Sequence, residues 1–194
     1  EETERVLSNI YSLLLNGHQI ILNQVYVSIG FNQIQDSILR HLVIARISQP
    51  MSKHATVDYL KSYFDEDVEL YKLYRYMDKL YDTQKEEVQR ISVEHTKRIL
   101  GGHVGLMFYD VTTLYFETSR TDVLRESGFS KDGKTSESQI VLGLLVSRDG
   151  YPLSYCIFNG SQYEGYTMLP IIDDFIQRFF LDDFVVVADA GLMS

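Results

Sequence analysis

The sequence predicts an α/β protein whose helices precede a mixed β-sheet, and two observations carry this prediction. Over roughly the first hundred residues, apolar side chains recur with the three- and four-residue spacing of amphipathic helices. After Gly101-Gly102 the spacing changes to short apolar or alternating runs, which are typical of strands. We therefore expect a helical region over residues 1–101 and a sheet-containing domain over residues 102–194.

The helical region is punctuated by recognisable start and stop signals. Predicted helices cover residues 6–14, 33–47, 68–80 and 83–100. Asn16-Gly17 is predicted to end the first, and Thr83 with Glu86 forms a capping box at the start of the last. Residues 18–30 fit either a helix or a short strand. Five tyrosines of this region are predicted to pack between helices rather than to stack on bases: Tyr59, Tyr63, Tyr71, Tyr74 and Tyr81.

The second half predicts three antiparallel strands, a helix and a final parallel strand. The predicted strands cover residues 104–109, 140–146, 151–158 and 184–188, and the helix covers residues 167–180. Arg148-Asp149-Gly150 is a tight turn between the second and third strands. The helical crossover favours a last strand parallel to its neighbour. Because residues 184–188 are almost uniformly apolar, we expect that strand to be buried on both faces.

Composition is that of a soluble globular chain of 194 residues, with 45% hydrophobic and 23% charged residues. No apolar run reaches the roughly 20 residues that span a bilayer. The single Cys156 fits a reducing compartment, so we expect a cytoplasmic protein and a buried, unreactive thiol. The net charge is −9, and residues 101–194 hold six basic residues against thirteen acidic ones. This acidic balance disfavours a large nucleic-acid surface on that half alone.

Two aspartates follow apolar strands of the predicted sheet. Asp110 comes after the first strand and Asp189 after the last. If those strands are parallel neighbours, about 4.8 Å apart, both carboxylates leave the same edge of the sheet. Two carboxylates so close repel and require a cation or a shared proton, and Mg²⁺ or Mn²⁺ prefers such oxygen ligands. The alternative is that each aspartate forms a turn or caps a following helix.

The connection between the first two strands, residues 118–138, is long for a hairpin. Its Lys131 and Lys134 either contact phosphates or belong to a solvated loop, and the sequence favours neither reading. His103, just before the first strand, is interpreted as structural rather than as a ligand.

Several segments, in this order, resemble bacterial insertion-sequence transposases of the DDE type, which have a ribonuclease-H-like core. They are HLVIARISQPMSKHATVDYL (41–60), YDVTTLYFE (109–117), GFSKDGK (128–134), QIVLGLLVSRDGYPL (139–153), YEGYTMLPII (163–172) and VVVADAGLMS (185–194). Each is unremarkable alone, but their order makes the resemblance specific, and it extends over most of the chain. It implies that the helical region binds DNA or dimerises and that the sheet is the first part of a ribonuclease-H-like catalytic domain.

The resemblance also implies roles for the two aspartates. Asp110 corresponds to the first acidic residue of the family's triad and Asp189 to the second. The third, a glutamate on a later helix, has no counterpart before Ser194. We therefore expect the front part of a longer enzyme that uses Mg²⁺ or Mn²⁺ to cleave double-stranded DNA at element ends and to join it to target DNA. This part alone is expected to be inactive.

Two alternatives remain open. The protein could be a non-catalytic DNA-binding or interaction protein derived from a transposase, or a metal-dependent nuclease of the same fold. The length of the natural reading frame separates the first alternative from a transposase, and an assay for joined DNA products separates the second.

Overall fold

The protein is described by a computed structural model covering residues 16–118, 120–128, 137–179 and 184–189. The chain divides into two compact units after Ile91, which lies within helix α6 (Lys85–Ile99). Each unit is described by itself below.

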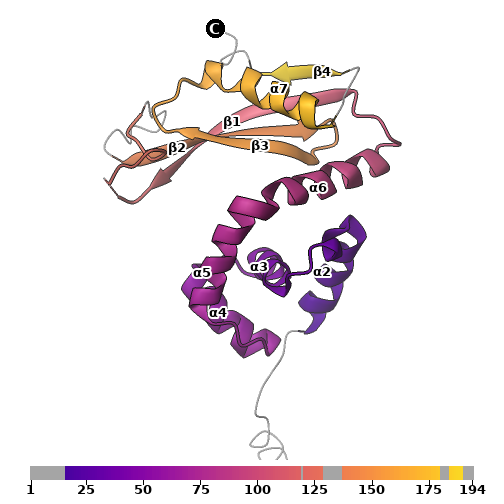
Figure 1. The fold of residues 1–194 in the computed structure, drawn as a ribbon, viewed down its shortest axis with the longest axis vertical. Helices are drawn as coiled ribbons and strands as arrows, with labels where there is room; N and C mark the ends of the chain where they lie inside the picture. Colours follow the sequence, from indigo (N-terminus) through magenta and orange to yellow (C-terminus); the bar gives the residue numbers. More distant parts are fainter. Residues whose placement is uncertain (1–15, 119, 129–136, 180–183, 190–194) are drawn as a thin grey trace, which may run out of the picture. The chain divides into compact units, whose positions relative to one another are not determined.

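The first unit is helical (Figure 1). Its elements are α2 (Asn16–Ile29), η1 (Phe31–Gln33), α3 (Ser37–Ser48), α4 (Lys53–Tyr59), η2 (Leu60–Phe64), α5 (Leu70–Lys79), η3 (Leu80–Gln84) and the first part of α6. Side-chain caps fix two of the helix starts. Asp36 accepts a hydrogen bond from the Ile38 amide at 3.1 Å, and Ser52 accepts one from the Ala55 amide at 3.2 Å. These contacts satisfy amides that a helix leaves unpaired in its first turn.

Apolar side chains of this unit form two clusters. One gathers around Leu60 and Leu73, which are almost completely buried between α3, α4, η2 and α5. The other joins Ile34 and Leu39 to Tyr76 and Ile91. The helical spacing of apolar residues in the sequence therefore marks faces that do pack together.

Two predicted helix boundaries are wrong. Asn16 and Gly17 lie within α2, so they do not end a helix there, and residues 18–29 are helical rather than extended. Thr83 does not cap a new helix: its hydroxyl donates to the Lys79 carbonyl at 2.8 Å, and η3, a π-helical turn, joins α5 directly to α6. A threonine hydroxyl can bond back to the preceding turn of a continuing helix. The predicted helix at residues 6–14 lies outside the described residues.

The tyrosines of the first unit are mostly at its surface. Tyr59 is buried as predicted, but the other four are exposed: Tyr63, Tyr71, Tyr74 and Tyr81, with exposed fractions from 40% to 73%. The prediction that all five pack between helices is therefore wrong for these four. Helical spacing identifies residues that share a face but not whether another element covers that face.

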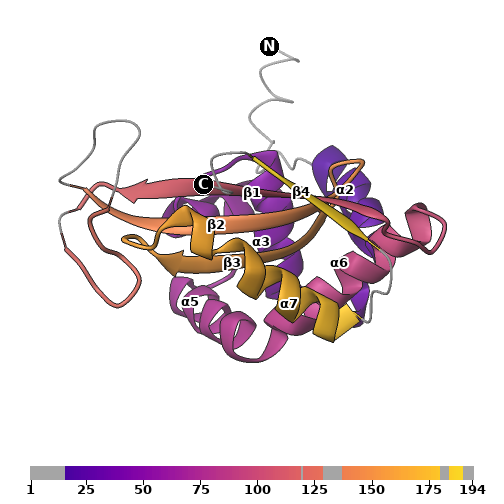
Figure 2. The same cartoon turned by 90° about the horizontal axis from the view of Figure 1, so that it is seen from above.

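The second unit contains a four-stranded mixed sheet in the order β3-β2-β1-β4. Its strands are β1 (Leu106–Phe116), β2 (Ser138–Ser147), β3 (Pro152–Asn159) and β4 (Val185–Ala188). β1, β2 and β3 pair antiparallel, and β4 lies parallel to β1 (Figure 2). The predicted mixed α/β fold, with three antiparallel strands, a helix and a parallel strand, is confirmed.

Helix α7 (Met168–Phe179) covers one face of this sheet (Figure 1). The core beneath it joins Ile171 and Phe175 of α7 to Met107, Tyr109 and Leu145 of the sheet, all 2% exposed or less. Cys156 is half-buried beside this cluster rather than fully buried. Alternate residues of β1 face this core, so Phe108 and Asp110 face the opposite side.

Two details of the predicted strands are wrong. β1 does not end before Asp110 but continues to Phe116, because Val111–Phe116 is rich in β-branched and aromatic residues and pairs with β2 along its whole length. β4 is not buried on both faces, since Val185 and Val187 are 60% and 42% exposed. Among the described strands, β4 pairs with β1 alone, so the other edge of β4 has no described neighbour.

Candidate metal centre

The strand register brings the two predicted site residues to one place. In the parallel pair, Met107 aligns with Val186, Phe108 with Val187 and Tyr109 with Ala188. Continuing this register by one residue aligns Asp110 with Asp189. Neighbouring strands are about 4.8 Å apart, and aligned residues of parallel strands project from the same face. Both aspartates are exposed and lie on the face opposite α7.

Asp110 is thus inside β1 rather than at its end, but it stands where the pairing with β4 stops. Its Oδ1 accepts a hydrogen bond from the Val111 amide at 2.8 Å. That bond orients the carboxylate along the strand and leaves its other oxygen available to a cation. An asparagine could accept the same bond, so an Asp110→Asn change removes the charge while keeping this contact.

The residue before Asp110 anchors the strand in the core. Tyr109 is 2% exposed, and its hydroxyl donates to Thr167 Oγ1 at 2.6 Å. Thr167 Oγ1 in turn donates to the Glu164 carbonyl at 2.6 Å. Burial raises the pKa of the Tyr109 hydroxyl above its ordinary value and outweighs the hydrogen bond with Thr167, which lowers it; Cys156, Asp110 and Glu164 add smaller upward contributions. The hydroxyl therefore remains protonated at neutral pH and acts as a donor.

The Tyr109→Phe substitution is expected to lower the free energy of unfolding by about 0.5–1.5 kcal/mol, because it removes one buried hydrogen bond without changing the apolar ring. Thr167 still donates to the Glu164 carbonyl in the variant, so no buried donor is left unpaired. Urea denaturation measures the change. Tyr166→Phe is the matched control, since Tyr166 is 73% exposed. Equal stability of the Tyr109→Phe variant and the parent would contradict the anchoring role.

The carboxylate oxygens of Asp110 and Asp189 are of the chemical type that hard divalent cations bind. Carboxylate oxygens are the ligands that Mg²⁺ and Mn²⁺ prefer. Within the part of the chain that the structure describes, however, no group of three His, Cys, Asp or Glu side chains stands close enough to hold a metal ion. Asp110 and Asp189 would therefore supply two ligands, and solvent or a further ligand would complete the coordination.

The predicted phosphate-contacting lysines, Lys131 and Lys134, lie outside the described residues. The described part of the same connection is attached to the sheet. Glu126 and Gln139 exchange two backbone hydrogen bonds, of 3.2 and 2.9 Å, and the Asn159 side chain donates to the Val123 carbonyl at 2.9 Å. Residues up to Gly128 thus follow the ends of β2 and β3.

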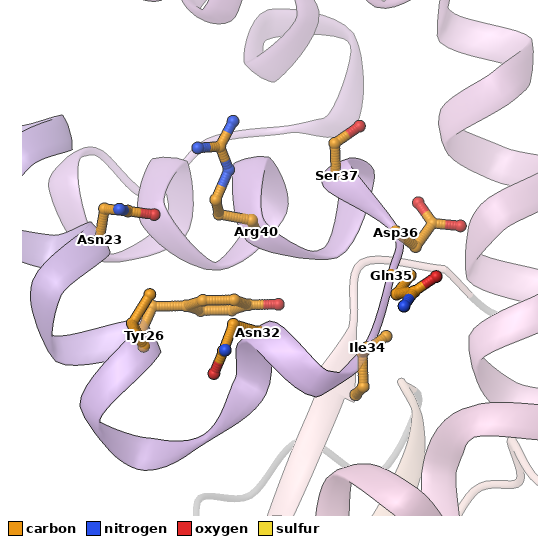
Figure 3. Close-up of a pocket in the computed structure, with 9 residues that line it drawn as sticks. Asn23, Tyr26, Asn32, Ile34, Gln35, Asp36, Ser37 and Arg40 are labelled. Carbon is orange, nitrogen blue, oxygen red and sulfur yellow. The ribbon is translucent and has the colours of Figure 1, made fainter.

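A cavity of about 200 Å³ lies in the helical unit between α2, η1 and the start of α3 (Figure 3). Tyr26 is 5% exposed, and its hydroxyl has no hydrogen-bond partner among the described residues. Burial raises the pKa of this hydroxyl, so it remains neutral. The charged groups of the cavity already have partners, because Asp36 pairs with Lys79 at 3.1 Å and Arg40 lies 3.6 Å from Glu66. We assign this cavity no ligand.

A buried histidine stands in the helical unit as well. His41 is 5% exposed, and its Nε2 lies 3.1 Å from Glu66 Oε1. Burial lowers the pKa of His41, and this effect outweighs the attraction of Glu66, which acts in the opposite direction. His41 is therefore neutral at physiological pH and bonds Glu66 as a structural side chain.

No family model, curated protein or solved structure matches this chain. Among the described helices, none combines the length and apolar character that crossing a bilayer requires.

Proposed function

We propose that this chain belongs to a DDE-type transposase with a ribonuclease-H-like core, an enzyme that cleaves and joins DNA by metal-dependent phosphoryl transfer. The observation that supports the proposal most is the register of β1 and β4, whose continuation by one residue past Tyr109 and Ala188 aligns Asp110 with Asp189. Asp110 and Asp189 are more than seventy positions apart in the sequence, and the resemblance assigns the first two catalytic carboxylates to this same pair.

In the proposed reaction, Asp110 and Asp189 hold Mg²⁺ or Mn²⁺. When bound, such ions activate a water molecule or a 3′-hydroxyl for attack and neutralise charge on the leaving oxygen. The residues of the chain supply position: the Val111 amide orients Asp110, and Tyr109 fixes the strand beneath it through Thr167. The proposed substrates are double-stranded DNA at the element ends and in the target, and the proposed location is the bacterial cytoplasm, in contact with the nucleoid.

The reaction also requires a third carboxylate, which the described residues do not bring to this pair. We propose that residues 1–194 alone hold a cation weakly and do not cleave DNA. The helical unit is proposed to bind element-end DNA or to form a homodimer. The absence of a third acidic ligand among the described residues also favours, as a second candidate, a non-catalytic DNA-binding protein. Detection of Mg²⁺-dependent strand cleavage in any form of the protein would eliminate that candidate.

Paramagnetic relaxation by Mn²⁺ tests the metal centre directly. At low Mn²⁺ we expect selective loss of the backbone amide signals that flank both aspartates, Tyr109–Val111 and Val187–Asp189, because a bound Mn²⁺ would lie close to both segments. Asp110→Asn should remove this selectivity. Asp173→Asn, at an exposed position of α7, is a control with the same change of charge and should leave it intact. Broadening centred on other acidic residues and unaffected by Asp110→Asn would reject the proposed centre.

A further inference from the structure

A second cavity lies in the sheet-containing unit, beside the start of β1. It has a volume of about 390 Å³ and is lined by Leu100, by residues 103–106 and by Arg148 and Asp149 of the turn between β2 and β3. Three of its lining residues carry ionisable side chains: His103, Arg148 and Asp149. Two are potential cations, although this half of the chain is strongly acidic.

Backbone hydrogen bonds fix the walls of this cavity. The Arg148 amide donates to the Leu106 carbonyl at 3.2 Å, which attaches the turn to β1. Within the turn, the Gly150 amide donates to the Ser147 carbonyl at 2.9 Å, and Gly150 has a φ of 85°, a conformation that favours glycine. The Arg148 side chain therefore extends from a well-defined position.

The side chains of His103 and Arg148 have no competing partners in the part of the chain that the structure describes. Neither His103 nor Arg148 makes a side-chain hydrogen bond or ion pair with any residue that the structure describes, and both are exposed. Asp149 shares the cavity but lies beyond ion-pair distance of Arg148. The His103 ring lies against Gly105, where an added Cβ would stand 2.9 Å from Nε2. Because Gly105 has no side chain, the His103 imidazole can lie in this position at the cavity wall.

These donors suit a phosphate group. A guanidinium offers planar paired N–H donors that match phosphate oxygens, and an imidazole adds a further donor. An anion here would also be the partner that Arg148 does not have among the described residues. The single carboxylate of Asp149 offsets part of the attraction, so we expect moderate affinity for one phosphodiester rather than tight binding of a free polyanion.

The position of the cavity relates it to the metal centre. Leu106, Phe108 and Asp110 alternate with core residues along β1 and so lie on one face. Leu106 and Asp110 are separated by roughly 13 Å, at about 3.3 Å per residue. A DNA strand advances about 3.4 Å per nucleotide along the helix axis, so this distance corresponds to roughly four nucleotides. Phe108 and Val187, 38% and 42% exposed, form the surface between the two positions.

We propose that His103 and Arg148 bind a backbone phosphate of the DNA strand on which the Asp110–Asp189 centre acts, about four nucleotides from the reacting phosphate. This inference rests on the proposed function for its substrate, but the anion site itself does not depend on metal binding. It gives the acidic unit a defined point of contact with DNA in place of an extended basic surface.

Fluorescence anisotropy with a labelled DNA duplex, measured over a range of salt concentrations, tests the proposal on residues 1–194. Arg148→Ala is expected to weaken binding about tenfold at low salt, as for loss of one charged hydrogen-bonded contact. It should also reduce the slope of log affinity against log salt by about one. Arg125→Ala is the matched control, because Arg125 is already paired with Asp122 at 2.7 Å, and it should leave the slope unchanged. An unchanged slope in Arg148→Ala, or no binding by the parent chain at low salt, would overturn the proposal.

A second measurement separates this inference from the proposed function. In NMR titrations with inorganic phosphate, we expect the His103 imidazole signals to shift, and Arg148→Ala to suppress the shift. Arg148→Lys, which keeps the charge but loses the planar fork, should retain part of it. A His103 response without Mn²⁺ binding at Asp110 would support the anion site and reject the metal centre. Mn²⁺ binding at Asp110, with neither a His103 response nor an effect of Arg148→Ala on DNA binding, would support the metal centre and reject the anion site. A His103 response without any effect of Arg148 on DNA binding would overturn the assignment to nucleic acid.

Discussion

The Gly143→Ala substitution is expected to lower the free energy of unfolding of the sheet-containing unit by about 1–3 kcal/mol. Gly143 lies in the middle of β2, opposite Val111, and the Tyr109 ring lies across it. A Cβ at this position would overlap the Tyr109 hydroxyl oxygen and stand 3.1 Å from two ring carbons. Such contacts cannot be accommodated without moving the tyrosine, whose hydroxyl is fixed by Thr167.

Two opposing effects determine whether the Gly143→Ala variant is less or more stable than the parent. Alanine loses less backbone entropy than glycine on entering a strand, which favours the variant by roughly 0.5–1 kcal/mol. The overlap with a fully buried tyrosine costs more, because a close-packed core has no space into which the ring can move. The steric cost should therefore outweigh the entropic gain.

Urea denaturation of Gly143→Ala and Gly17→Ala provides the comparison. Gly17 lies in α2 with no atom within 4 Å of an added Cβ, so its alanine variant should be as stable as the parent or up to about 1 kcal/mol more stable. Because Tyr109 directly precedes Asp110, repacking at position 143 should also weaken the Mn²⁺ effect on the Asp110 amide. A Gly143→Ala protein as stable as the Gly17→Ala protein would show that Tyr109 does not hold this strand in place.

Much of the sheet could be predicted from local patterns. The apolar runs of β2, β3 and β4 and the Arg148–Gly150 turn lie where the sequence indicates, since strand spacing and turn chemistry are both local properties. The helix between β3 and β4 makes a parallel last strand the favoured connection, and β4 is parallel to β1. The alignment of Asp110 with Asp189 follows from that pairing.

The sequence predicts that a strand or helix exists more readily than it predicts where that strand or helix ends. Asp110 looks like the end of a strand because aspartate disfavours strands, but Val111–Phe116 has enough β-branched and aromatic residues to extend β1 past it. Thr83 looks like a helix start, yet its hydroxyl bonds backwards to Lys79 within a helix that continues. In both cases a polar residue suggests the boundary of an element, but the neighbouring residues continue that element through it.

Exposure could not be deduced from the sequence. Val185 and Val187 have the composition of a buried strand, but no described element covers their face. The cavity formed by His103 and Arg148 also gave no sequence signal. Arg148 belongs to a turn that Asp149-Gly150 already explains, and His103 is distant from it in sequence. The antiparallel pairing of β1 with β2 and the hydrogen bond between Arg148 and Leu106 at its end bring the two segments together.

The Asp189→Asn substitution is expected to remove metal-dependent stabilisation while leaving the metal-free protein as stable as the parent, or up to about 1 kcal/mol more stable. If the register of β1 and β4 continues by one residue, the parent in EDTA holds two neighbouring carboxylates, and replacing one removes the repulsion between them. Asp189 accepts no hydrogen bond from any other described residue, so the change removes no described stabilising contact. The two exposed charges are largely screened by solvent, which keeps the expected gain small.

With metal present, the parent should be more stable than the Asp189→Asn variant. A ligand that binds only the folded state stabilises it by RT ln(1 + [L]/Kd), or about 1.4 kcal/mol at ten times the dissociation constant. The parent should gain this amount from Mn²⁺, and Asp189→Asn should gain little, since one carboxylate remains at the site. Urea melts of both proteins in EDTA and in Mn²⁺ measure the difference. A variant clearly less stable than the parent in EDTA would mean that Asp189 caps a turn or a following helix, as the alternative reading of the sequence holds. In that case the loss of an N-cap contact, which costs about 1 kcal/mol, would exceed the repulsion between the carboxylates.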